Sequence, residues 1–153
     1  MSGSASSLLI QPLGLSLLFV VFWLGVCAML SRIGGWSSLV APFRAKYPPR
    51  GERFRFVSGS LGSERFPVSY KSSLFVVVSR HGLHLSVYFP FRFQSPALFI
   101  PWGEVDSVAE KPFLRTFGVT LRLRRPWPVI SVRGQAGHSI REAFAIASAA
   151  KTL

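Results

Sequence analysis

The chain of 153 residues has few of the side chains on which enzyme and metal chemistry depends. It contains one cysteine, three histidines and six acidic residues. The single cysteine, Cys27, has no partner for a disulfide within the chain. The sequence contains no phosphate loop of the form G-x-x-x-x-G-K-[ST], no G-x-G-x-x-G fingerprint and no HExxH motif. We therefore predict a protein that is not an enzyme and has no catalytic site, cofactor or metal.

The remaining acids and histidines do not combine into a recognisable set. Glu104 and Asp106 stand two residues apart, which would place them on one face of a strand. We interpret that pair as a solvated edge, because no nucleophile or base accompanies it. His81 and His84 flank a predicted turn, and His138 is distant from both in sequence. A zinc site from these histidines has no supporting cysteine, so we interpret them as surface or turn residues.

Charge is absent from the first 31 residues, in which the run from Leu8 to Leu30 is mostly apolar. As a helix this run would be about 34 Å long, enough to cross a hydrocarbon core of about 30 Å. A cleavable secretory signal would instead have a basic start and a shorter apolar centre. The sequence therefore predicts a short non-cytoplasmic tail at 1–7 and a transmembrane helix at 8–31.

Basic residues follow this run and none precedes it. Arg32 comes directly after the run, and five more basic residues follow before residue 56, namely Arg44, Lys46, Arg50, Arg53 and Arg55. Basic residues near one end of a span favour the cytoplasmic side of the membrane. We therefore expect a single-pass protein with its N-terminus outside and the rest of the chain in the cytoplasm.

The same five residues are candidate contacts for anionic lipid. A basic side chain close to an anionic membrane surface contributes about 1 kcal/mol of attraction. Arg65 and Lys71 are more distant candidates. The alternative interpretation is that these charges only set the orientation of the helix.

Residues 32–52 are predicted to form a juxtamembrane amphipathic segment and linker. Gly34-Gly35 interrupts the helical pattern, and apolar residues then recur at helical spacing, at Trp36, Leu39, Val40, Phe43 and Tyr47. This stripe is typical of a short helix that lies in the membrane surface, with Trp36 as its interface anchor. Pro48-Pro49 ends the segment and marks the boundary of a second unit.

Residues 53–153 are long enough for one domain and mostly show the alternation typical of strands. The candidate strands are 53–56, 74–78, 83–89, 98–102, 105–109, 119–124 and 129–133. The continuous apolar run at 74–78 predicts a strand covered on both faces. Ser139 and Glu142 form an S-x-x-E capping box ahead of a helix at 140–150. The pattern predicts about seven or eight strands and then one helix, in a small barrel or sandwich.

This order resembles the pleckstrin-homology-like superfold, a bent antiparallel barrel of about 7–8 strands with one C-terminal helix. Gly82-Leu83-His84-Leu85 and the segment from Leu98 to Val105 are similar to the "glyl" turn and "iPW..I" strand of bacterial membrane proteins with such domains. Gly35-Trp36, Leu39 and Phe43 are similar to a linker found in small uncharacterised bacterial membrane proteins with one N-terminal helix. The resemblance implies a bacterial inner-membrane location. It also implies an adaptor or assembly protein whose domain binds protein segments or anionic lipid headgroups.

The basic character of the chain leaves a second function open. The net charge is +12, and arginines alternate with aromatic residues at 53–56, 91–93 and 122–127. This pattern is also found in proteins that pair with phosphates and stack on bases, so a membrane-tethered nucleic-acid-binding protein is the alternative. Strand alternation alone produces the same string. We therefore expect membrane lipids and another protein as partners, and no small-molecule substrate.

Overall fold

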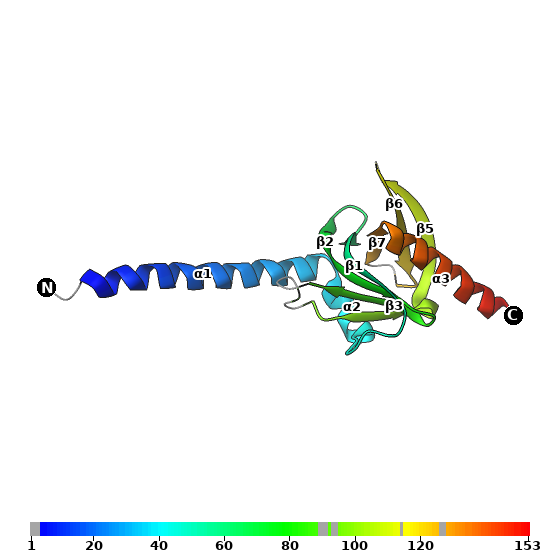
Figure 1. The fold of residues 1–153 in the computed structure, drawn as a ribbon, viewed down its shortest axis with the longest axis horizontal. Helices are drawn as coiled ribbons and strands as arrows, with labels where there is room; N and C mark the ends of the chain where they lie inside the picture. Colours follow the sequence, from blue (N-terminus) through cyan, green and yellow to red (C-terminus); the bar gives the residue numbers. More distant parts are fainter. Residues whose placement is uncertain (1–3, 89–91, 93–94, 114, 126–127) are drawn as a thin grey trace.

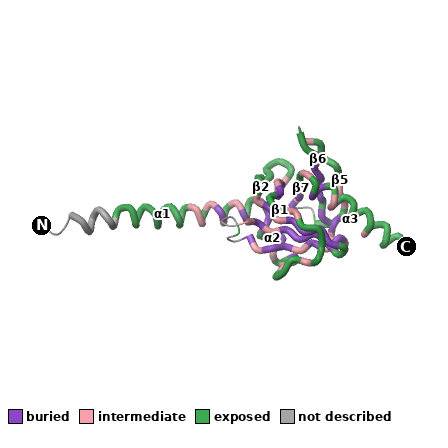
Figure 2. Tube along the Cα trace, in the orientation of Figure 1, coloured by how far each residue is buried: buried purple, intermediate pink, exposed green. Residues whose placement is uncertain are grey.

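The computed structural model describes residues 4–88, 92, 95–113, 115–125 and 128–153, with only the backbone for residues 4–10. The first element, α1 (Ser4–Ile33), is a long helix that extends away from a β domain (Figure 1). In the described part of the chain, α1 is the one helix long and apolar enough to cross a membrane, by length and composition. Its middle has large apolar side chains that no protein covers, such as Leu13 and Phe22 (Figure 2). Residues 1–3 of the predicted tail, and Phe91, Phe93, Pro126 and Trp127 of the aromatic–arginine segments, lie outside the described residues.

Seven strands form one antiparallel sheet in the order β4-β3-β2-β1-β7-β6-β5. They are β1 (Glu52–Gly62), β2 (Pro67–Val78), β3 (Gly82–Val87), β4 (Leu98–Pro101), β5 (Val105–Phe113), β6 (Thr116–Leu123) and β7 (Val129–Arg133). A short 3-10 turn, η1 (Trp102–Glu104), joins β4 to β5, the two edge strands. The sheet is curled, and because these edges do not pair with each other it forms a half-barrel rather than a closed barrel. The predicted arrangement of an N-terminal apolar helix, a mainly-β domain and one C-terminal helix is confirmed.

β1 bends where it crosses the middle of the sheet. Its register with β2 shifts between Phe54 and Val57 and again between Val57 and Gly59. Phe56 and, on β2, Ser72 have positive φ angles of 54° and 49°. Bulky side chains rarely adopt this conformation, and such bulges turn a strand. Beyond the bend, the last residues of β1 pair with β7 as well as with β2.

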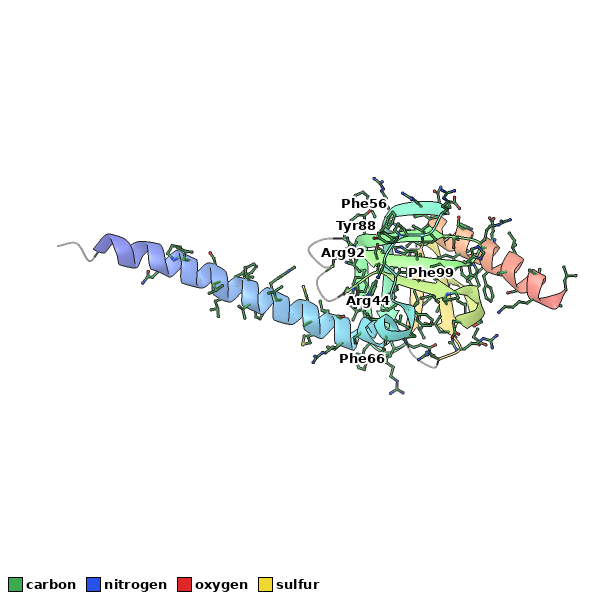
Figure 3. All side chains as sticks on the ribbon, turned by 90° about the horizontal axis from the view of Figure 1, so that it is seen from below. Arg44, Phe56, Phe66, Tyr88, Arg92 and Phe99 are labelled. Atoms are coloured by element: carbon green, nitrogen blue, oxygen red, sulfur yellow. The ribbon has the colours of Figure 1, made fainter. Side chains whose placement is uncertain are left out.

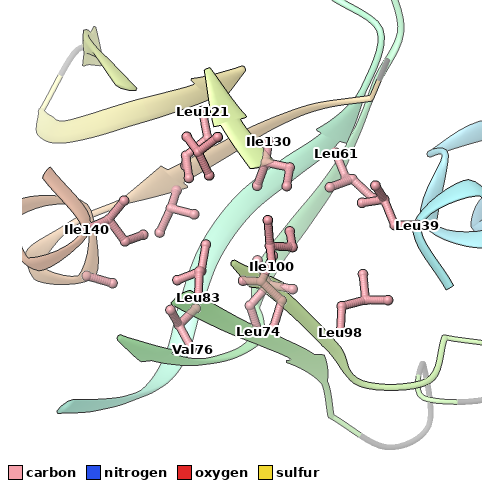
Figure 4. Close-up of a cluster of buried hydrophobic side chains, with 14 of the residues drawn as sticks. Leu39, Leu61, Leu74, Val76, Leu83, Leu98, Ile100, Leu121, Ile130 and Ile140 are labelled. Carbon is pink, nitrogen blue, oxygen red and sulfur yellow. The ribbon is translucent and has the colours of Figure 1, made fainter. Parts of the chain in front are cut away.

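Two helices complete a hydrophobic core on the concave side of this sheet. They are α2 (Trp36–Phe43) and α3 (Gln135–Thr152). Figure 4 shows Leu39 of α2 and Ile140 of α3 entering the core from opposite sides. Val76 and Val77, neighbours on β2, are both fully buried, which confirms the prediction of a strand covered on both faces.

The helix predicted for the membrane surface packs inside the domain instead. Trp36 is 1% exposed and its indole Nε1 donates a hydrogen bond of 2.9 Å to the carbonyl of Pro96. The Ala45 amide donates to the carbonyl of Ala97, beside the edge of β4. Trp36 therefore lies in the hydrophobic core of the domain, and residues on both sides of the predicted boundary at 48–52 share this core. An apolar stripe shows that a helix face is buried, and the open edge of the half-barrel supplies the surface that buries it.

The start of α3 also differs from the sequence pattern. The helix begins at Gln135 rather than at 140, after Gly134, which has a φ of 81°. Ser139 lies within the helix, and its hydroxyl donates a hydrogen bond of 2.8 Å to the carboxylate of Glu52 on β1. The predicted capping box is therefore wrong, because Ser139 ties α3 to the sheet rather than capping the helix.

Candidate functional site

The last turns of α1 pack against the domain and fix which end of it faces the helix. Cys27 and Ser31 are 6% and 2% exposed, whereas apolar residues earlier in α1 are mostly uncovered. A Cβ added to Gly34 would lie 3.2 Å from the Cβ of Val68 on β2. The hairpin between β1 and β2 therefore lies directly beside the end of α1.

Aromatic and basic side chains, most of them exposed, gather at this α1-facing end. Figure 3 shows Phe66 beside the end of α1, with Arg44, Arg92, Tyr88 and Phe56 at the same end of the domain. We call these five residues the rim. Phe56 and Phe66 are 67% and 74% exposed, and both arginines are exposed. The rings of Phe56 and Tyr88 stack with their centroids 5.1 Å apart. The rim thus presents aromatic rings and guanidinium groups together to the space around α1.

The hairpin tip at residues 63–66 is held by two interactions. The Phe66 amide donates a hydrogen bond of 3.0 Å to the hydroxyl of Ser63. Arg122 on β6 forms an ion pair with Glu64. Both members of this pair are largely exposed, so it contributes at most about 1 kcal/mol. The two interactions leave the side chains of Arg65 and Phe66 exposed.

A buried histidine lies on the outer face of the sheet. His84 pairs with Val77 on β2 and with Phe99 on β4, and it is 2% exposed. Neither ring nitrogen has a hydrogen-bond partner among the described residues. The edge of Phe75 meets its ring at 6.3 Å between centroids. Burial, and then the positive charge of Arg92, lower the pKa of His84 from its usual value of 6.5, so the ring is neutral at pH 7.

The residues considered for metal or acid–base chemistry stay apart. His81 is exposed in the turn before β3, and His138 on α3 stacks on Phe117 of β6 at 3.8 Å between ring centroids. In the part of the chain that the structure describes, no group of three possible metal ligands occurs. Glu104 lies in η1 and Asp106 in β5. The two carboxylates therefore do not share one strand face, contrary to the prediction.

The structure separates the five predicted lipid contacts. Arg44 follows α2 and belongs to the rim, and Arg55 is next to Phe56 in the bend of β1. Arg50 and Arg53 lie at the start of β1, the opposite end from the hairpin beside α1. That end contacts α3, which extends away from α1 (Figure 1). Lys46 is exposed in the linker after α2.

Four of the five rim residues were not predicted as site residues. Strand alternation at 53–56 places Phe56 in the core, but the bulge turns it outward. Tyr88 lies on the polar side of an alternating strand, and Phe66 stands in a turn just before Pro67. An aromatic ring in a polar turn was the one signal available in the sequence, because a turn has no core face to bury it.

No model of a known protein family matches the chain, and no curated protein sequence matches it either. The geometry of the rim and its position beside α1 are thus the basis for a functional argument.

Proposed function

We propose that the chain is a non-enzymatic, single-pass membrane protein whose β domain binds anionic lipid headgroups through the rim. The observation that carries this proposal is the position of the rim, at the end of the domain where α1 leaves it. α1 has 30 residues and is about 45 Å long, whereas about 20 residues cross a bilayer. The last turns, which pack on the domain, therefore remain available at the membrane surface.

The chemistry of the rim suits that surface. Guanidinium groups bind phosphate with two parallel hydrogen bonds, and aromatic rings are favoured at the depth of the headgroups. Arg32 in the last turn of α1 and Arg65 at the hairpin tip add two more positive charges nearby. The net charge of +12 and the uncharged N-terminal segment support a cytoplasmic domain beside an anionic inner leaflet.

We extend the proposal to the fold family and the location. Seven antiparallel strands followed by one helix, with Gly82 packed closely on Ile100, support a pleckstrin-homology-like domain. This resemblance in turn supports the inner membrane of a bacterium. An adaptor role follows if the lipid-bound domain also holds another protein.

Hydrogen exchange of the full-length chain in lipid nanodiscs tests the lipid contact. We expect amides around the rim to exchange more slowly in anionic than in neutral nanodiscs. The Arg44→Gln/Arg92→Gln variant should lose this difference, because each arginine contributes about 1 kcal/mol of attraction. Raising the salt concentration should have the same effect.

The matched control is Arg50→Gln/Arg80→Gln, which removes the same charge from exposed positions at the far end of the domain. It should keep the slower exchange. Equal exchange in both lipids, or an equal loss in the control, would contradict the proposal. Stronger protection of the rim by single-stranded DNA than by anionic lipid would favour the nucleic-acid alternative.

A further inference from the structure

We propose that Phe66, at the tip of the β1–β2 hairpin, inserts into the interfacial layer of the bilayer beside the exit of α1. The domain would then be held to the membrane at two points, by the helix and by an aromatic side chain. This inference rests on the part of the proposed function in which α1 crosses a membrane. It does not require anionic lipid.

The depth of the hairpin follows from its contact with α1. Gly34, which packs on Val68 of β2, lies seven residues after Cys27, or about 10 Å along the helix. The span ends between Cys27, about 20 residues after Leu8, and Ile33, the last residue of the candidate span Gln11–Ile33. Because the headgroup layer on each side is about 5–8 Å thick, Val68 lies within this layer or close to its outer boundary. Phe66 is two residues from Val68, at the tip of the hairpin, so its ring is within reach of the layer.

The tip of the hairpin exposes this ring on a turn whose backbone is held in place. Phe66 is 74% exposed and makes no ring contact with the described residues, whereas the exposed ring of Phe56 stacks on Tyr88. The Ser63 hydrogen bond and the ion pair of Glu64 with Arg122 hold the turn in place. Because the turn is already held in place, insertion of the uncovered phenyl ring into an apolar environment requires little further ordering of the backbone.

The neighbouring side chains favour a bilayer as the occupant. Arg65 is exposed next to Phe66 and suits a layer of lipid phosphates. A second copy of this chain would bring another strongly positive surface to the same place, because each chain carries a net charge of +12. Trp36, the aromatic residue expected at this depth from the sequence, is buried in the core, whereas Phe66 is an exposed ring beside α1 among the residues that the structure describes.

A fluorescent reporter beside Phe66 tests the insertion in the full-length chain. In a Cys27→Ala background, Arg65→Cys is labelled with an environment-sensitive dye and the protein is reconstituted in neutral phosphatidylcholine nanodiscs. We expect blue-shifted emission and quenching by spin-labelled lipid. Phe66→Ser in the same background should lose both signals. Ile146→Ser on α3, which removes another largely exposed apolar side chain outside the rim, should keep them.

A second reporter at Tyr47→Cys, on an 83% exposed residue of the linker, should emit as in water. An unshifted, unquenched dye at residue 65, or one that Phe66→Ser leaves unchanged, would overturn the inference. If the dye at residue 65 is shielded from water only when one nanodisc holds two copies of the chain, the inference would also be overturned, in favour of a contact between chains. Because the lipid is neutral, a positive result here is independent of whether the rim arginines distinguish anionic lipid.

Discussion

His84 shows how one side chain can couple the stability of this domain to pH. Its imidazole is buried without a hydrogen-bond partner in the described structure, and its pKa is lowered by burial and by Arg92. Above the unfolded value near 6.5, the ring is neutral in both the folded and the unfolded chain. As the pH falls below that value, the unfolded chain binds a proton before the folded chain does. Stability present above pH 6.5 is therefore lost as the pH falls through the lowered pKa.

The substitution His84→Leu should remove this loss. We expect the free energy of unfolding of the wild type, measured by urea in detergent micelles, to fall between about pH 7.5 and pH 5. The variant should show a smaller fall. At pH 7.5 it should be as stable as the wild type or more stable by about 1 kcal/mol, because it removes two ring nitrogens that have no hydrogen-bond partner among the described residues. The exposed His81→Leu serves as the control and should keep the full pH dependence. A variant with an unchanged pH profile would show that other groups cause the fall.

Phe56 shows a limit of residue-scale prediction. The alternation at 53–56 predicts an inward ring, and the two register shifts in β1 reverse that direction. A bulge depends on how a strand must bend between two partners, and a short window of sequence does not contain that information. The same bend accounts for the positive φ of Phe56, which costs about 1–2 kcal/mol in a residue other than glycine.

At the scale of elements, α2 shows that a sequence pattern can predict a helix without predicting what covers its apolar face. The spacing of Trp36, Leu39 and Phe43 predicts an amphipathic helix and the structure contains it. The pattern is equally compatible with a lipid surface and a protein core, because both bury one apolar face. The hydrogen bond from Trp36 to Pro96, sixty residues later in the chain, belongs to a contact that no local pattern predicts.

Substitution of Trp36 distinguishes a core residue from a membrane anchor. Trp36→Ala should lower the free energy of unfolding in detergent by about 3–5 kcal/mol, because it opens a cavity and leaves the Pro96 carbonyl unpaired. Tyr47→Ala, in the same predicted stripe but 83% exposed, should change it by less than about 0.5 kcal/mol. Chemical unfolding followed by circular dichroism measures both. Equal, small effects would indicate that Trp36 does not support the core.

The position of Gly82 gives a structural reason for a glycine at the start of β3. A Cβ at this position would lie 2.4 Å from the carbonyl oxygen of Ile100 on β4. The residue therefore allows β3 and β4 to approach closely at the end where η1 begins. This role is structural, and it links the two segments that carry the resemblance, which are 82–85 and 98–105.

At the scale of the whole molecule, α2, the sheet and α3 form one unit around a shared hydrophobic core. The core contains Trp36, Leu39 and Phe43 together with residues of β1 to β7 and of α3. α1 contributes its last turns to the outside of this unit. A fragment of the chain that begins at Pro48-Pro49 would therefore lack the core side chains of α2.

Two fragments test that organisation. The fragment 34–153 should unfold cooperatively, because it keeps α2 and the sheet together. The fragment 48–153 should be unfolded or molten, because it lacks three core side chains whose burial contributes about 2 kcal/mol or more each. Urea titration and near-ultraviolet circular dichroism separate these outcomes. Equal stability of the two fragments would show that the β domain does not need α2.

The sequence by itself determined the long apolar helix, the asymmetry of charge around it, the period-two strands and the C-terminal helix. Each of these depends on side chains within one turn or one strand, so a local pattern is sufficient. The tertiary structure alone decided that Trp36 is buried and that Arg50 and Arg53 lie at the end of β1 opposite the hairpin beside α1. It also placed Phe56, Phe66, Tyr88 and Arg92 beside Arg44 in one rim. These outcomes depend on where β1 bends and on which edge of the sheet packs against α2. Both are decided by contacts between residues far apart in the sequence, which form only when the chain folds.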